Sequence, residues 1–205
     1  MFIAIEGCMA SGKSSTAQLV SDELGITLVK EQSSGHPFLA QFYANPGLFA
    51  LETELAFALI HYHQLHQLAG AAMVSDFSPV KDLVFAEMNL SGEELQMFRQ
   101  LYQMLAGRVP LPDIVVFLDL PVDECKRRCI ARGRPYEANI SLEYLSALRD
   151  EYRRHMSELG KEVHLVEVAV GQRQRSVAEA VLEKVFQSPY LAADLRSRLG
   201  KDQTR

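Results

Sequence analysis

Residues 7–14 constrain the fold of this chain more than any other segment. They read GCMASGKS and match the pattern G-x-x-x-x-G-K-[ST]. An apolar run, FIAIE, precedes them, and a stretch with helical periodicity, SSTAQLVSDEL, follows. A strand, a glycine-rich turn and a helix N-terminus together bind anions, because backbone N–H groups and the helix dipole converge on one point. The segment therefore predicts a phosphate-binding P-loop; the alternative is a glycine-rich turn without function.

The residues of this loop have expected roles in holding a triphosphate. Gly7 and Gly12 adopt backbone conformations that other residues resist, which lets successive N–H groups approach phosphate oxygens. Lys13 is expected to reach the β and γ phosphates, and the Ser14 hydroxyl to ligate magnesium. The expected cofactors are ATP and Mg²⁺. The loop residues expected to contact the nucleotide are Gly7, Ala10, Ser11, Gly12, Lys13, Ser14 and Ser15.

Short apolar runs rich in β-branched residues alternate with longer stretches of helical periodicity. The apolar runs are residues 2–5, 26–29, 113–118 and 163–168, with a weaker one at 71–74. The helical stretches are residues 14–24, about 47–68, 91–105, 122–132 and 142–159. This alternation predicts an α/β fold of the P-loop NTPase type, with a parallel sheet of about five strands and helices on both faces. Ligands are expected at the carboxyl ends of the strands.

Length and composition limit the other possibilities. The chain has 205 residues, enough for one domain spanning 1–205, in which 188–205 form a polar tail that is expected to fray. Its formal net charge of −5 argues against a general nucleic-acid binder, and no apolar run approaches the roughly 20 residues that span a bilayer. The start lacks the features of a signal peptide, and three cysteines fit a reducing compartment. We therefore expect a cytoplasmic protein without nucleic-acid or membrane partners.

Residues 128–145 carry a more specific signal. They read RCIARGRPYEANISLEYL and resemble the lid helix and following helix of the deoxynucleoside kinases, whose motif is R-x-x-x-R-x-R-x-x-E followed by I-x-L-x-Y-L. The likeness extends to Glu31, to residues 37–51 and to residues 78–90, and covers about residues 1–155. The chain thus resembles a diverged bacterial-type member of the deoxyadenosine, deoxycytidine and deoxyguanosine kinases, which implies a short Arg-rich lid and a role in nucleotide salvage.

The resemblance implies a role for each matching residue. Glu31 would be the general base that takes the proton of the nucleoside 5′-hydroxyl, and Tyr43 and Glu137 would hold the 3′-hydroxyl of the deoxyribose. Asp76 would help to place magnesium, and Asp82 would face the base. Each has a structural alternative, since a Glu after a strand is usually a surface charge and a Tyr on a helical stripe usually belongs to the core.

Three arginines of the predicted lid, Arg128, Arg132 and Arg134, would clamp the phosphates as the lid closes. Arg128 and Arg132 lie one helical turn apart and share a face, and guanidinium groups match phosphate oxygens. Arg132 and Arg134 are expected to contact ATP, and Arg128 and Arg132 to act in catalysis with Lys13 and Glu31. The alternative for an Arg-rich helix is a solvated face.

Two departures from the family pattern stand out. The family has an acidic residue, Arg and Ser after the third strand, whereas this chain has Asp76, Phe77 and Ser78. In the family that arginine helps to orient the base and meets the transferring phosphate. Losing one preorganised charged donor costs on the order of 10²–10³ in rate. Lys81 and His61 are the candidates for a substitute charge.

The second departure lies in the predicted base pocket, where the family glutamine is replaced by Glu54. Glutamine donates and accepts hydrogen bonds, whereas an ionised glutamate only accepts. With Asp82 nearby, two acceptors favour an amino-bearing nucleoside, such as deoxyadenosine or deoxycytidine, over thymidine. Alternatively, the two carboxylates share a proton, or pair with Lys81.

Three functions are compatible with the sequence. The first is ATP-dependent phosphorylation of a deoxynucleoside to its 5′-monophosphate, which Glu31, Tyr43 and Glu137 favour. The second is another small-acceptor kinase, such as a nucleoside monophosphate kinase of the thymidylate type, which needs additional cations for the acceptor phosphate. The third is a kinase-like protein that binds nucleotide without turnover, suggested by Phe77 and Glu54. The resemblance also implies a homodimer packed through helices.

Overall fold

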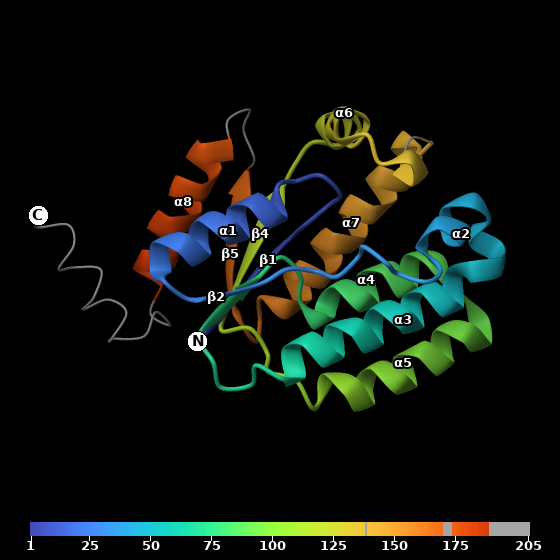
Figure 1. Cartoon of the computed structure of the whole chain (residues 1–205), viewed down its shortest axis with the longest axis horizontal. Helices are drawn as coiled ribbons and strands as arrows, with labels where there is room; N and C mark the ends of the chain where they lie inside the picture. Colours follow the sequence, from blue (N-terminus) through green and yellow to red (C-terminus); the bar gives the residue numbers. More distant parts are fainter. Residues whose placement is uncertain (138, 170–173, 189–205) are drawn as a thin grey trace, which may run out of the picture.

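A computed structural model describes residues 1–137, 139–169 and 174–188 of the chain. Its five strands form one parallel sheet in the order β2-β3-β1-β4-β5 (Figure 1). The strands are β1 (Phe2–Gly7), β2 (Thr27–Val29), β3 (Met73–Ser75), β4 (Ile114–Asp119) and β5 (His164–Ala169). The prediction of a five-stranded parallel α/β sheet is therefore confirmed.

Helices surround this sheet. They are α1 (Lys13–Leu24), α2 (Leu39–Ala44), α3 (Pro46–His66), α4 (Pro79–Asn89), α5 (Gly92–Ala106), α6 (Val122–Arg132), α7 (Leu142–Leu159) and α8 (Gln174–Gln187), with a 3-10 helix η1 (Pro135–Glu137). In the described part of the chain, no helix is long and apolar enough to span a membrane. From the sequence we also expect the adenine of ATP to lie near the loop after the last strand, around residues 170–173. This loop and residues 189–205 of the predicted tail are outside the described residues.

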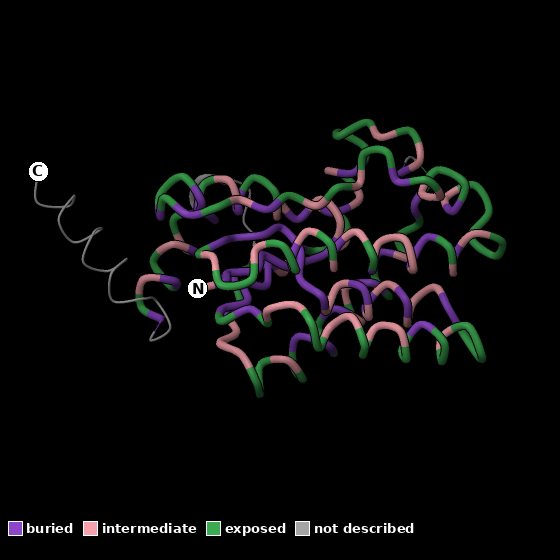
Figure 2. Tube along the Cα trace, turned by 60° about the horizontal axis from the view of Figure 1, so that its bottom comes forward, coloured by how far each residue is buried: buried purple, intermediate pink, exposed green. Residues whose placement is uncertain are grey.

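The central strand β1 is buried on both faces, which explains its unbroken apolar run (Figure 2). Ile3 and Ile5 belong to a core with α1 and α8 on one face, whereas Phe2 and Ala4 belong to a core with α4, α6 and α7 on the other. Side chains alternate across a strand, so this one strand contributes side chains to the cores on both faces of the sheet. The parallel pairing brings the carboxyl ends of β1, β3 and β4 to the same edge.

Helices α2, α4 and α8 were not predicted from the sequence. Helix α2 has six residues, too few for a clear period. Helix α4 begins with Pro79, which fits the first turn of a helix because it needs no N–H partner there. In α8, Val177, Val181 and Val185 are buried at four-residue spacing, so the periodic signal was present in the sequence.

Candidate active site

The phosphate cradle forms where β1 ends and α1 begins. Gly7 has a φ of +147°, and a Cβ there would lie 2.6 Å from the Leu118 carbonyl oxygen and 2.8 Å from Ser11 Oγ. Gly12 has a φ of +105°, and Ala10 also has a positive φ, of +57°. Only glycine fits position 7, because any side chain would collide with the backbone of β4. The sequence GCMASGKS thus folds into the loop that its pattern predicts.

Lys13 lies at the first position of α1 and folds back over this loop. Its Nζ donates hydrogen bonds to the carbonyl oxygens of Gly7, at 2.8 Å, and Cys8, at 3.0 Å. Burial lowers the pKa of Lys13, and the neighbouring ammonium of Lys81 lowers it further. The Lys13 ammonium therefore lies against the loop. An anionic ligand bound there would reduce the repulsion between Lys13 and Lys81.

Ser14 and Asp76 bring oxygen atoms together at the same edge of the sheet. Ser14 Oγ donates a hydrogen bond to Asp76 Oδ2, and Asp76 Oδ1 accepts the backbone N–H of Glu31 at 2.7 Å. A hydroxyl and a carboxylate are the hard oxygen ligands that Mg²⁺ prefers. The donor set beside the phosphate cradle therefore fits this ion.

Glu31 is the centre of a charged network. Its Oε1 accepts hydrogen bonds from His61 Nε2, at 3.1 Å, and from Lys81 Nζ, and its side chain is 18% exposed. The other ring nitrogen of His61 lies 2.6 Å from Asp82 Oδ1. His61 is 1% exposed, so the imidazole links the two carboxylates away from bulk water.

The network fixes the charges of its members. Burial raises the pKa of the Glu31 carboxyl, but Lys81 and His61 lower it more, so the net shift is downward and the carboxyl is ionised. Burial lowers the pKa of His61, but Asp82 and Glu31 raise it, with a net value of about 9. At neutral pH His61 is therefore an imidazolium that donates one hydrogen bond to each carboxylate.

Phe77 lies at the end of β3, where the family carries arginine. The ring is fully buried and stacks on His61, with centroids 4.3 Å apart and planes at 24°. Instead of a cation, the strand end thus supplies an apolar surface that holds the imidazole in place. Both residues named from the sequence as candidates for a substitute charge, His61 and Lys81, contact Glu31.

Glu54 lies in the interior between α3 and α4, and is 3% exposed. Asn89 Nδ2 donates a hydrogen bond to Glu54 Oε1 at 2.8 Å. Burial raises the pKa of Glu54 to about 8; Asp82 contributes to this shift, whereas Asn89 and Lys81 oppose it. The Glu54 carboxyl is therefore mostly protonated at neutral pH and, in that state, donates as well as accepts.

The predicted lid residues lie on α6, on η1 and, for Arg134, in the connection between them. Arg132 donates to Glu137 Oε2, with Nη2 at 2.5 Å, and Arg134 Nη1 donates to Glu137 Oε1 at 3.3 Å. Glu137 is 2% exposed. Tyr136 stacks on Tyr43 of α2, with ring centroids 5.2 Å apart. The segment after α6 thus packs against α2 through this ring stack.

These features line one cavity of about 630 Å³ at the carboxyl edge of the sheet. Every site residue predicted from the sequence except Gly7 lines this cavity: Ala10, Ser11, Gly12, Lys13, Ser14, Ser15, Glu31, Tyr43, Glu54, Asp76, Asp82, Arg128, Arg132, Arg134 and Glu137. Phe57, Tyr136 and Phe85 also line it and were not predicted. Apolar side chains on helices carry no sequence signal that distinguishes a pocket wall from the core.

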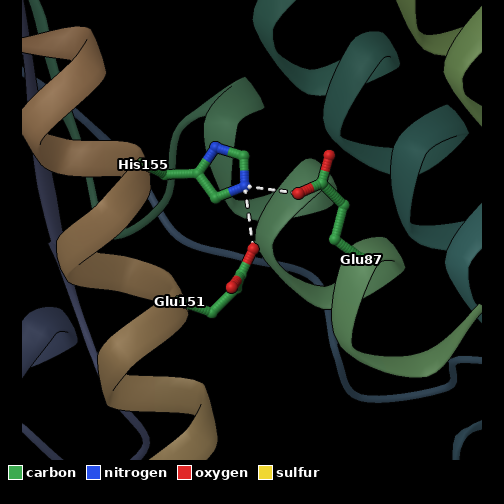
Figure 3. Close-up of side chains that lie close together, drawn as sticks. All are labelled: Glu87, Glu151 and His155. Atoms are coloured by element: carbon green, nitrogen blue, oxygen red, sulfur yellow. Dashed lines mark hydrogen bonds and ion pairs between the residues drawn. The ribbon is translucent and has the colours of Figure 1, made fainter.

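A second polar cluster lies between α4 and α7, where Glu87, Glu151 and His155 come together (Figure 3). His155 Nε2 is 3.2 Å from Glu87 Oε2 and 3.5 Å from Glu151 Oε1. The guanidinium of Arg154 contacts both carboxylates. The chain thus provides its own cation for this cluster, which therefore joins two helices through ion pairs.

Comparisons with known proteins place the chain among its relatives. The family model described as deoxynucleoside kinase matches residues 3–188. The deoxyguanosine kinase of Bacillus subtilis is 29% identical over 164 residues, covering 77% of this chain and 79% of the relative. That of Lactobacillus acidophilus is 31% identical over 163 residues, covering 74% and 70%.

A solved structure shares the fold. It is the deoxyadenosine kinase of M. mycoides with the products dCMP and a flexible dCDP bound, and it has a TM-score of 0.84, with 21% sequence identity. The match covers 92% of this chain and all of the other. With the family model spanning almost all described residues, the chain belongs to the deoxynucleoside kinase family.

Proposed function

We propose that this deoxynucleoside kinase transfers the γ-phosphoryl group of ATP, bound with Mg²⁺, to the 5′-hydroxyl of deoxyguanosine. Family membership gives the reaction, ATP-dependent phosphorylation of a deoxynucleoside. The proposal adds the acceptor, the metal and the residues that act. One observation carries it: the P-loop and Glu31 line the same cavity, and the lid arginines line it too.

Each group then has a role in the transfer. Lys13 and the loop N–H groups hold the β and γ phosphates, and Ser14 and Asp76 hold Mg²⁺, which neutralises phosphate charge when bound. Glu31 accepts the proton of the 5′-hydroxyl. Arg128 and Arg132 neutralise the phosphates from the lid side, with Arg134 beside them. Catalysis of this kind rests on positioning and charge more than on covalent chemistry.

The deoxyribose is assigned to the space under the lid. Tyr43 and Glu137 hold its 3′-hydroxyl, because both line the cavity and the stack of Tyr43 on Tyr136 brings their two segments together. Arg132 and Arg134 both donate to the Glu137 carboxyl group, which fixes its position, and a carboxyl oxygen can accept the hydrogen bond of that hydroxyl.

The base is assigned to Glu54 and Asp82. Guanine presents adjacent N–H donors on its Watson–Crick edge, and two carboxylates offer the acceptors that such an edge needs. The two relatives from Bacillus subtilis and Lactobacillus acidophilus are both named deoxyguanosine kinases. Guanine also bears an amino group, which the sequence leads us to expect of the base. Deoxyadenosine and deoxycytidine are the examples of such nucleosides expected from the sequence, and deoxyguanosine is a third.

The protonation of Glu54 makes this choice depend on pH. Only the ionised form of Glu54 accepts two guanine donors, and its pKa is raised to about 8. Asp82, Lys81 and His61 are the charged groups that act on it. Between pH 7 and pH 8.5 the ionised fraction rises about eightfold, and we expect the ratio of kcat/KM for deoxyguanosine over thymidine to rise by a similar factor.

Initial rates with both nucleosides across this pH range measure the ratio. A Glu54→Gln variant is the matched control, because its side chain keeps the shape but does not titrate, so its ratio should stay level. A wild-type ratio that is constant or falls with pH contradicts the assignment of Glu54 to the base.

The function itself is tested by ADP release with ATP, Mg²⁺ and each of the four common deoxynucleosides. We expect deoxyguanosine to stimulate release most strongly, and mass spectrometry to show deoxyguanosine monophosphate as the product. A diphosphate formed from a monophosphate acceptor would identify a nucleoside monophosphate kinase instead. ATP binding without stimulated release would favour a kinase-like protein without turnover.

A homodimer is also proposed, through the outer surface of α3 and α5. Leu48 and Leu59 of α3 are 65% and 51% exposed, and Met97 and Met104 of α5 are 47% and 63% exposed. In sequence, an apolar stripe runs over residues 48–65 and could serve as an interface or belong to the core; it is not one surface, because Leu65 is fully buried. Sedimentation equilibrium distinguishes one copy from two, and Leu59→Glu should weaken the dimer.

A further inference from the structure

The charge that family members carry at the end of β3 is absent from this chain at that position. Phe77 is fully buried and stacks on His61, so nothing there can reach a phosphate. A kinase that lacks this donor needs a positive charge from another element, since charge on the transferring group is stabilised by preorganised cations.

Lys81, in the first turn of α4, brings a cation into the same cavity. Its Nζ contacts Glu31 Oε1, its side chain is 13% exposed, and it lines the cavity with Lys13 and the lid arginines. The rings of Phe85 and Phe57 lie beneath it, with centroids 5.5 Å and 6.0 Å from Nζ. Aromatic faces hold an ammonium group in position without removing its hydrogen-bond donors.

The charges around Lys81 keep it protonated. Burial lowers its pKa, but Glu31, Glu6 and Asp76 together raise it more. Glu31 is the proposed base and Asp76 a proposed metal ligand, so Lys81 lies within electrostatic reach of both the acceptor and the donor side of the reaction. Its ammonium also acts on the pKa of Lys13 in the phosphate cradle.

Two cations share Glu31 Oε1, but only Lys81 is free to change partner. His61 uses both ring nitrogens, toward Glu31 and Asp82, and is stacked on Phe77. Lys81 has three N–H donors on a flexible four-carbon stem, so it can bind Glu31 and a second anion together. The imidazolium therefore positions Glu31, and the ammonium has donors left for a ligand.

We propose that Lys81 is a catalytic residue that binds the transferring phosphoryl group in place of the missing arginine. The inference rests on the proposed function. In the transfer, the bond from the 5′-oxygen to the γ-phosphorus forms, the bond from that phosphorus to the β,γ-bridging oxygen breaks, and the hydroxyl proton passes to Glu31. Protonation neutralises Glu31 and weakens its attraction for Lys81. The ammonium group can then bind the phosphoryl oxygens more strongly. Lys81 keeps its own protons throughout.

Steady-state kinetics of Lys81→Met and Lys81→Arg test this role. We expect Lys81→Met to lower kcat by about 10²–10³-fold, while the Kd values for deoxynucleoside and for a non-hydrolysable ATP analogue change less than about threefold. Lys81→Arg keeps the charge and should recover most of the lost rate. Lys161→Met, at an exposed position in the turn after α7, is the matched control and should behave as wild type.

A chemical-rescue measurement separates charge from packing. Added ethylamine should restore part of the kcat of Lys81→Ala, whereas an uncharged alcohol of the same size should not. The proposal is overturned if Lys81→Met keeps a kcat within about threefold of wild type, or if the loss falls on nucleoside Kd alone. If Lys81→Met does not fold, the kcat of Lys81→Arg is compared with that of Lys81→Ala measured without added ethylamine. Equal values of these two rates overturn the proposal as well. Absence of turnover by the wild-type chain in the same assay would refute the proposed function instead.

Discussion

Replacing Glu31 with Gln is expected to lower kcat by about 10²–10⁴-fold, the range that general-base catalysis contributes. The amide keeps the size of the side chain and can still contact His61 and Lys81, but it cannot take the hydroxyl proton. The carboxylate is held ionised by the two cations that contact it, so the change removes a base that is present at neutral pH. ADP formation with saturating deoxyguanosine and ATP measures the loss.

Substrate binding should survive this change. A nucleoside Kd within a few-fold of wild type, together with the reduced kcat, would identify an interaction made in the transition state. The matched control is Glu93→Gln, an exposed glutamate on α5. A Glu31→Gln enzyme that turns over at the wild-type rate would exclude Glu31 as the base, even if the chain phosphorylates deoxyguanosine.

Replacing Lys13 with Met has the second large expected effect, a loss of about 10²–10³-fold in kcat together with a higher KM for ATP. Lys13 Nζ already lies over the loop, bonded to the carbonyl oxygens of Gly7 and Cys8. The methionine side chain fills a similar volume without the charge, so the cradle should persist while the phosphates lose their nearest cation. Initial rates over a range of ATP concentrations separate kcat from KM.

Lys13→Arg refines this result. Because the cradle closes tightly on a slender ammonium, the broader guanidinium should restore charge but only part of the rate. Lys13→Met should unfold at a temperature no lower than wild type, because the pKa of Lys13 is lowered in the folded state and its charged form therefore does not favour folding at neutral pH. Equal activity of Lys13→Met and wild type would mean that the triphosphate is bound elsewhere in the cavity.

Much of the fold could be predicted because its signals are local. The run FIAIE and the glycine-rich loop fix the strand, the turn and the start of α1 within six residues of one another, and the structure has each of them there. The lid motif is also local: Arg132 and Arg134 both contact Glu137, which follows them by five and three residues in sequence.

The network around Glu31 could not be predicted in the same way, because its members meet only in three dimensions. His61 is 30 residues from Glu31 and 21 from Asp82 in sequence. Only the parallel sheet and the packing of α3 against α4 bring them together. On a helix, His61 carries no sequence pattern that distinguishes it from a surface histidine.

Burial also separates two glutamates that look alike in sequence. Glu52 and Glu54 both interrupt an apolar stretch of α3, yet Glu52 is exposed and Glu54 is 3% exposed. The register of α3 against α4 decides which carboxyl turns inward, and with it which one is protonated at neutral pH. The resemblance to the family points to position 54, but the state of ionisation of its carboxyl group follows from its surroundings.

The carboxylate of Asp76 links the two halves of the cavity. One oxygen contacts Ser14 beside the phosphate cradle, and the other holds the backbone N–H of Glu31 at 2.7 Å. Any event that moves this carboxylate toward a metal ion also shifts the peptide that carries the base. We therefore expect donor and acceptor affinities to be linked through this side chain, and by reciprocity each ligand would then change the affinity of the other by the same factor.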